Sequence, residues 1–191
     1  FQAEWAAARA IDPILPDYDV QVLETDPAMI IGQAVSYLRL VDRRYVNKVY
    51  RALLAPFAVG SDLAALVASR NIARLTVLPA AGNSEAVLEG DVALFRRYLL
   101  SFDRAAAAST GRYLYEAWTV WPQSEDKEHG LWDAKVNGFD EHGRRGDTDV
   151  VIIGPNGRAP TASEISAVFG AITAVGIRSE AVSVAVLPAT R

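Results

Sequence analysis

Hydrophobic residues return at helical spacing through most of the first 121 residues. The strongest pattern runs from Pro27 to about Leu54, where apolar residues recur every three or four positions and arginines gather on the other face. Asp26 can cap this helix, Pro27 suits its first turn, and Pro56 ends it. The pattern predicts one long amphipathic helix, packed along one side.

The same spacing predicts several shorter helices. One covers the alanine-rich residues 4–10, one opens at residues 60–62 with Ser61 or Asp62 as its cap, one is capped by Asp91, and one runs from residues 109–111 to Pro122. In the helix after Asp91, the apolar residues at helical spacing are Val92, Phe95, Leu99 and Phe102. The first half of the chain is therefore expected to be helical.

The pattern changes after Pro122. Residues 131–139 alternate weakly, residues 148–153 form a β-branched run typical of a central strand, and residues 181–187 predict a last strand. Between the last two strands, Thr161 and Glu164 form a capping-box pattern at the start of a helix. The order α-β-β-α-β predicts an α+β fold with a small mixed sheet, in which a helical domain of residues 1–103 precedes an α-β-β-α-β domain of residues 104–191. A sheet of three strands leaves two edges for pairing or cover.

Composition narrows the classes of function. The chain has 191 residues and no cysteine, which excludes a disulfide framework and a cysteine-ligated zinc site. A net charge of -4 argues against a general nucleic-acid binder, and no apolar run approaches the roughly 20 residues that span a bilayer. The first residue is Phe1 rather than Met, so the sequence is expected to be a trimmed piece.

Charge is unevenly distributed near the N-terminus. Six acids and one base precede Pro27, whereas five bases and one acid lie between Arg39 and Arg51. The acids are Glu4, Asp12, Asp17, Asp19, Glu24 and Asp26, and the bases are Arg39, Arg43, Arg44, Lys48 and Arg51. These charges either pair within the chain, which is the simpler interpretation, or dock on a neighbouring protein.

Residues 125–149 are the one region where metal or acid–base chemistry could lie. His129, His142 and several carboxylates crowd there, but their spacing matches no established ligand motif. A hydrolase that uses a metal or a carboxylate pair is the alternative function, and solvated loop charges are the simpler interpretation. We expect no catalytic residue, no metal, no cofactor and no small-molecule substrate.

Several surface residues are candidates for contacts with other proteins. The basic helix face could bind phosphates through charge alone, but a solvated or paired face is the simpler interpretation, and we expect no nucleic-acid or membrane partner. Residues 143–147 are predicted to form a hairpin tip, and two tryptophans flank the change from helix to sheet, where aromatic side chains can anchor a partner. The interface candidates are Arg39, Arg43, Arg44, Lys48, Trp121, Trp132, Arg144 and Arg145.

An ordered set of segments resembles the baseplate J-like family of contractile phage tails. The set starts with residues 15–20 and 24–27, continues through residues 51–63, 95–97 and 109–115, and ends with GDTDVVIIGPNGRAPTASEISAVFGAI and VSVAVLPA. Two features depart from the family pattern. The family usually has a turn that contains a proline after the last helix, and here residues 177–180, which contain no proline, take its place. Residues 123–146 form a longer and more charged segment than expected. Family members generally continue further, so a C-terminal segment is expected beyond residue 191.

The resemblance implies a structural role without catalysis. It predicts a wedge subunit of a contractile phage or prophage-derived baseplate, which associates with copies of itself and with other wedge proteins. The expected location is the tail baseplate of the virion, after assembly in the cytoplasm of the bacterial host.

Overall fold

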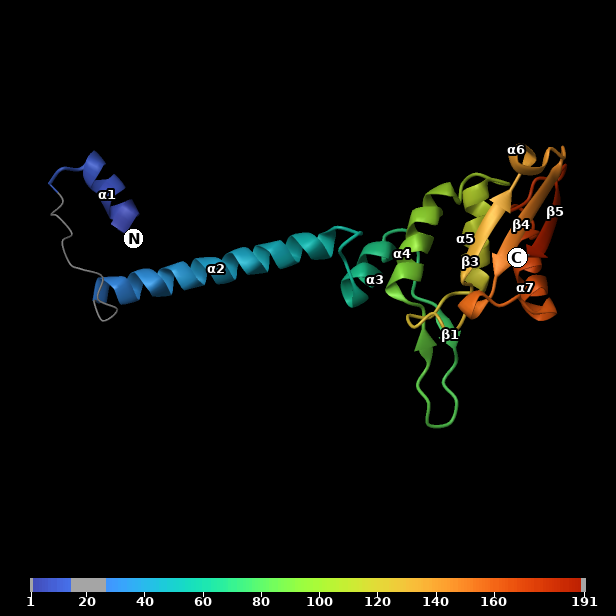
Figure 1. The fold of residues 1–191 in the computed structure, drawn as a ribbon, viewed down its shortest axis with the longest axis horizontal. Coiled ribbons are helices and arrows are strands. Elements are labelled where there is room, and N and C mark those ends of the chain that lie inside the picture. Colours follow the sequence, from blue (N-terminus) through green and yellow to red (C-terminus); the bar gives the residue numbers. More distant parts are fainter. Residues whose placement is uncertain (1, 15–26, 190–191) are drawn as a thin grey trace. The chain divides into compact units, whose positions relative to one another are not determined.

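The computed structural model describes residues 2–14 and 27–189, and it divides into two compact units, Phe1–Arg51 and Ala52–Arg191 (Figure 1). The first unit holds α1, Gln2–Ile11, and nearly all of α2, Pro27–Leu53. Both helices were predicted, and α2 begins at the expected proline. Its predicted cap, Asp26, lies outside the described residues.

The packing predicted for α2 is wrong for the part of the chain that the structure describes. No side chain of this 27-residue helix is buried. The sequence pattern correctly indicated an apolar face, but a pattern of this kind cannot say which surface covers it. Among the described residues, no contact is extensive enough to bury a side chain of this face.

The second unit begins with helices around a small core. It contains α3, Gly60–Ala68, a hairpin of β1, Thr76–Leu78, and β2, Val87–Leu88, then α4, Asp91–Leu100, and the short helix η1, Ser101–Asp103. Leu63 and Val67 of α3 pack with Leu94 of α4 and Tyr115 of the next helix. The loop at residues 79–84 was expected, whereas the two short strands beside it were not.

The predicted apolar spacing of α4 does not mark its buried side. Val92, Leu99 and Phe102 are all more than half exposed, and the buried residues of α4 are Ala93, Leu94 and Arg97. Arg97 is only 3% exposed and donates from Nη1 to Glu89 Oε2 at 2.5 Å. The buried side of α4 therefore includes an ion pair as well as Leu94, and a purely hydrophobic pattern misses the charged part.

The caps predicted for α3 and α4 are also wrong. Val59 is the N-cap of α3 and Gly90 is the N-cap of α4, and neither has a side chain that can cap. Asp91 instead accepts a hydrogen bond at Oδ2 from the backbone N–H of Gly60, at 2.8 Å, and pairs with Arg74. One carboxylate thus satisfies a donor at the start of α3 and links that helix to α4.

The rest of the second unit has the predicted α-β-β-α-β order, with two short helices, α6 and η2, added. It comprises α5, Thr110–Val120; β3, Asp133–Asn137; α6, Phe139–His142; β4, Asp147–Ile153; η2, Pro155–Gly157; α7, Ala162–Ile172; and β5, Ser183–Pro188. The sheet order is β3-β4-β5, antiparallel between β3 and β4 and parallel between β4 and β5. The α+β fold class and the mixed sheet are confirmed.

The main core lies between this sheet and two helices. Val150 and Ile152 of the central strand pack with Tyr113 and Trp118 of α5 and with α7. Thr161 and Glu164 form the predicted capping box at the start of α7. The predicted domain boundary at residue 103 stays a prediction. Helices α4 and α5, on its two sides, pack on each other. Within residues 2–14 and 27–189, no helix is long and apolar enough to cross a membrane.

Candidate interaction surfaces

Among the described helices and strands, α2 has the most exposed large hydrophobic side chains. Twelve of its large hydrophobic side chains are between 41% and 69% exposed. They are Ile30, Ile31, Val35, Tyr37, Leu38, Leu40, Val41, Tyr45, Val46, Val49, Tyr50 and Leu53. Single exposed apolar side chains are common, but a run of this length along one helix is typical of a surface that binds another protein. At about 100° per residue they extend around more than half of the helix, and we call these twelve residues the α2 apolar face.

The predicted basic residues accompany this face. Arg39, Arg43, Arg44 and Lys48 are all exposed, and none forms an ion pair with another residue in the described ranges. Most of the acids proposed as their partners, Asp17 to Asp26, lie outside those ranges. A helix with five bases and one acid between Arg39 and Arg51 suits a partner surface with an excess of carboxylates.

The two arginines of the predicted hairpin tip have different surroundings. Arg144 forms ion pairs with Asp149 and, at 3.7 Å, with Asp147. Arg145 is exposed, with its guanidinium 5.8 Å from the centre of the Phe139 ring. Of the two, Arg145 is the side chain free of carboxylate partners among the described residues.

The two candidate tryptophans lie at the junction of α5 and the sheet, as expected. Trp121 is half-buried, and the Arg158 guanidinium lies 5.9 Å from its ring centre. Trp132 is 38% exposed, and its backbone N–H donates to Ile153 O at 3.0 Å. The structure therefore leaves part of each indole accessible, whereas Trp118 is buried.

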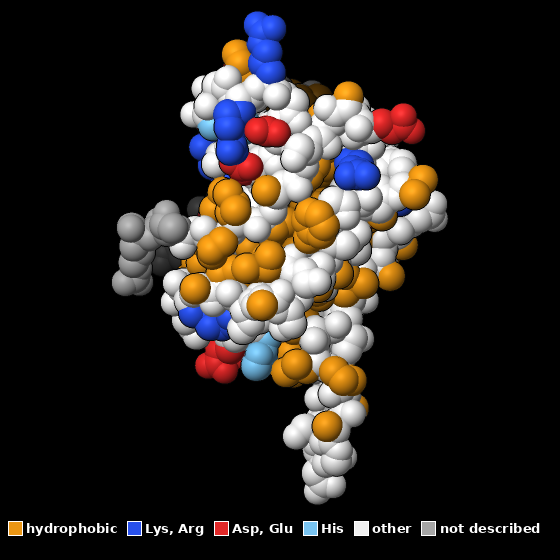
Figure 2. All heavy atoms as spheres, turned by 90° about the vertical axis from the view of Figure 1, so that its right-hand side faces the viewer, with side chains coloured by type: hydrophobic (Ala, Val, Ile, Leu, Met, Phe, Trp, Pro, Cys, Tyr) orange, Lys and Arg blue, Asp and Glu red, His pale blue; other side chains and the backbone are white. Residues whose placement is uncertain are grey.

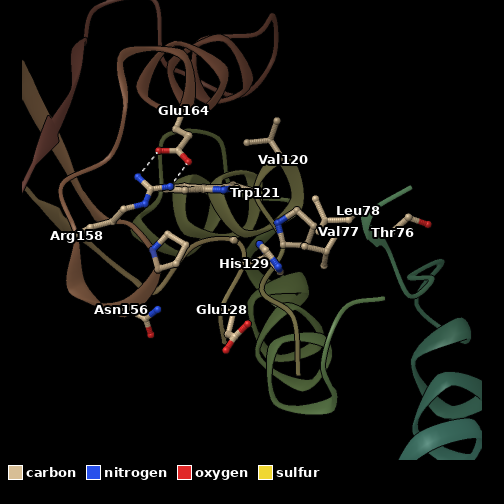
Figure 3. Close-up of a pocket in the computed structure, with 13 residues that line it drawn as sticks. Thr76, Val77, Leu78, Val120, Trp121, Glu128, His129, Asn156, Arg158 and Glu164 are labelled. Carbon is tan, nitrogen blue, oxygen red and sulfur yellow. Dashed lines mark hydrogen bonds and ion pairs between the residues drawn. The ribbon is translucent and has the colours of Figure 1, made fainter. Parts of the chain in front are cut away.

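Trp121 also lines an open depression of about 600 Å³ (Figure 3). Its walls come from β1, the end of α5, the loop before β3, η2 and the first turn of α7. Gly130, one of the residues that line it, has φ +91°, and a Cβ there would lie 1.9 Å from the carbonyl oxygen of Pro122. Only glycine fits this close return of the loop to the end of α5.

Two charged side chains of this depression, Arg158 and Glu164, are paired with each other. Arg158 holds Glu164 through two hydrogen bonds of 2.8 and 2.5 Å, drawn as dashed lines in Figure 3. These bonds lower the pKa of Glu164 to about 2, despite its partial burial. A carboxyl that stays ionised and doubly bonded to arginine is unsuited to be a general acid near neutral pH.

The acidic and histidine-rich residues 125–149 do not come together as a metal site. Within the described parts of the chain, no group of three or more His, Asp or Glu side chains is placed to hold a metal ion. Several of the carboxylates instead serve local structure: Asp126 accepts from Ser124 and from the Glu128 N–H, and Glu141 accepts from the Gly138 N–H. The hydrolase alternative gains no support from this geometry.

One surface was missed by the sequence. Hydrophobic side chains gather across the middle of the face formed by β4, β5 and α7, which is the right-hand side of Figure 1 (Figure 2). Phe169 of α7 is 43% exposed and Leu187 of β5 is 41% exposed. The alternation of β5 could have indicated an outward Leu187, but only the sheet order shows that β5 is an edge strand.

These features define an α+β protein with exposed apolar surfaces and, in the described residues, no assembled reaction centre. Exposed apolar surfaces of this kind are typical of subunits of protein assemblies. Comparisons with known proteins agree with this class. Residues 24–81 match the Baseplate J-like N-terminal domain family. The chain is also similar to baseplate protein J of Escherichia phage P2, with 33% identity over 98 residues.

The comparisons confirm the predicted resemblance to the baseplate J-like family. The matched region is 49% of this chain and 32% of the phage P2 protein, so the chain spans about a third of the length of that relative. Residues 24–81 include all of α2 and α3. The matched family domain therefore contains the α2 apolar face.

Proposed function

We propose that this protein is a structural subunit of a contractile phage or prophage-derived tail baseplate and acts by binding other baseplate proteins, without catalysis. The location that follows is the tail of the virion. The observation that carries the proposal is the α2 apolar face, which lies inside the segment matching the Baseplate J-like N-terminal domain and has no buried side chain.

The energetics of α2 support a role in assembly. An isolated helix is only marginally stable in water, and most helices in proteins are stabilised by packing of an apolar face. Burying apolar surface contributes roughly 25 cal/mol per Å², so covering twelve large side chains would stabilise an assembly substantially. The partner that fits is a protein with an apolar groove bordered by Asp and Glu, because those acids would meet the arginines and the lysine of α2.

Incorporation into tail particles tests the proposal. A tagged copy of the protein is expressed in a host that produces the cognate phage, and tails are isolated by density gradient. We expect the wild type in the tail fraction, with the tag located at the baseplate by electron microscopy. Leu38→Asp in the α2 apolar face should lower incorporation at least tenfold, because a carboxylate would be buried in the contact.

Two further variants complete this experiment. Leu99→Asp places the same change on α4, where Leu99 is 52% exposed, and should be incorporated like the wild type. Reversing charge at Arg43 and Lys48 should weaken assembly, most strongly at low salt. If the wild type is missing from tails, the proposed function is wrong; if Leu38→Asp is incorporated normally, the α2 apolar face is not the contact.

A further inference from the structure

The edge of β5 carries free backbone hydrogen-bonding groups. Ser183 N–H donates to Gly146 O at 2.7 Å, and Ala189 N–H donates to Ile152 O at 3.1 Å. Main-chain groups alternate in direction along a strand, so the N–H and C=O of Val184 and Val186 point away from β4. Among the described strands, β4 is the only neighbour of β5. The sheet therefore presents two donors and two acceptors in extended geometry.

The two edges of the sheet differ in charge. β3 carries Asp133 and Lys135, and charged side chains are a common device that keeps an edge strand from pairing. β5, with the sequence SVAVLP, carries no charge. The exposed side chains of α7, which packs against β5, are uncharged too. They are Ala162, Ser163, Ser166, Ala167 and Phe169.

We propose that β5 pairs antiparallel with β5 of a second copy of this chain, to form one continuous sheet of six strands. Val184 would face Val186 of the second copy, and Ala185 would lie opposite its own counterpart on the two-fold axis. This register uses all four outward groups of the two valines in each copy. The inference deepens the proposed function, because it gives self-association a surface distinct from α2.

Charge is the reason to choose a second copy over another partner. A two-fold axis places each residue near its own equivalents, so a charged surface meets like charge. The β5 edge and the exposed side chains of α7 are uncharged, so pairing of two copies there brings no like charges together. Pairing of two α2 helices would do so, because α2 has five bases and one acid between Arg39 and Arg51. The molecule thus has one surface suited to a copy of itself and another suited to an acidic protein.

Cysteine cross-linking tests the register, and the chain has no cysteine of its own. In the proposed pair, Ala185 and its counterpart have Cα atoms about 4.5 Å apart, within the range for a disulfide. Ala185→Cys should therefore form a covalent dimer under mild oxidation. Ser183→Cys is the matched control, because it lies on the same strand and face. The Cα atoms of its two copies would lie about 14 Å apart, too far for a disulfide. We expect at least tenfold less dimer from this control.

A mixture of two variants tests the strand direction. Antiparallel pairing places Ser183 opposite Leu187 of the second copy, so Ser183→Cys mixed with Leu187→Cys should cross-link, whereas neither should do so alone. Self-linking of all three single variants would indicate parallel pairing and overturn the proposal. The absence of a dimer from Ala185→Cys would overturn it as well.

Sedimentation of the cysteine-free chain provides a second readout. Ala185→Lys places two ammonium groups on the two-fold axis and should shift a dimer to the monomer. Asn137→Lys adds the same charge to the same face of the sheet on β3 and should leave the dimer intact, with unchanged circular dichroism for both variants. The inference would be overturned if the wild type were a monomer, or if Ala185→Lys formed a dimer as readily as the wild type. Incorporation into tails through α2 would still stand in that case, so the two proposals can fail separately.

Discussion

Helices α2 and α5 are both amphipathic, yet the structure uses them in opposite ways. The 27 residues of α2 include no buried side chain, whereas five of the 11 residues of α5 are buried. Those five are Gly111, Tyr113, Tyr115, Ala117 and Trp118. The same period of apolar residues thus builds a core in one helix and a free surface in the other. The difference teaches that periodicity identifies an apolar face, while tertiary context decides what covers it.

The largest loss of stability is expected for a substitution at Trp118, in the buried side of α5. This side chain is 1% exposed and packs between α5 and the sheet. Trp118→Ala should lower the free energy of unfolding by about 3–5 kcal/mol, because it leaves a cavity in the main core. Urea denaturation followed by circular dichroism measures this loss. Trp132→Ala, at a 38% exposed position, is the control and should cost about 1 kcal/mol or less.

Arg97 of α4 sharpens the comparison, because there a charge rather than an apolar residue is buried. Arg97→Met should destabilise the fold by about 3 kcal/mol at pH 7, since Glu89 is left without its partner in the interior. The double variant Arg97→Met/Glu89→Gln should recover part of this loss. A single variant as stable as the wild type at pH 7 would contradict the role given to this pair.

The pH dependence of the Arg97→Met loss has a definite sign. Burial raises the pKa of Glu89 above its ordinary 4.5, and the attraction of Arg97 offsets part of that rise. Removal of the arginine raises the pKa further, so the folded state binds a proton more readily than the unfolded state. Stability is then lost as the pH rises from about 4.5. The variant should be closer to the wild type at pH 5 than at pH 7 in denaturant titrations.

At the start of α7 we expect a smaller loss of stability, and its dependence on pH has the opposite sign to that of Arg97→Met. Arg158 holds the pKa of Glu164 at about 2, below its ordinary 4.5, so this carboxylate stabilises the fold above pH 4.5. Its contribution is lost as the pH falls from 4.5 toward 2. Glu164→Gln should cost about 0.5–1 kcal/mol at pH 7 and less at pH 3, in thermal unfolding at both pH values. A constant difference would show that the charge of Glu164 is not what stabilises the cap.

The smallest effect is expected in α2. Leu38→Ala should change the free energy of unfolding by less than about 0.5 kcal/mol, because this side chain is 60% exposed. The same variant should weaken incorporation into tails. Equilibrium unfolding and gradient fractionation of the same preparation separate the two effects. A large loss of stability would show that α2 packs within the chain and would break the contrast with α5.

Local chemistry explains what the sequence predicted well. The cap of α7 needs residues only three apart, and the central strand β4 follows from a run of β-branched side chains, so both are visible in sequence. The contact of Asp91 with the Gly60 N–H joins residues 31 apart, and no local pattern encodes it. The strands β1 and β2 have three and two residues, too few to show an alternation.

The candidate surfaces were predictable to different degrees. The exposed bases of α2 and the accessible tryptophans lie where the sequence placed them, although their contacts with other proteins stay predictions. The free edge of β5 could not be found from sequence, because it depends on which strand lies in the middle of the sheet. Charge could have drawn attention to it, since β5 is uncharged while β3 is not.

The close return at Gly130 has a consequence for the junction of helix and sheet. The next residue, Leu131, donates its N–H to Trp121 O at 3.1 Å. This hydrogen bond fixes the loop between α5 and β3 against the end of α5. One methyl group at position 130 would collide with backbone and not with a side chain that could turn aside. The backbone of this loop would therefore have to move away from the end of α5. The depression of about 600 Å³ beside Trp121 thus depends on a residue without a Cβ at position 130.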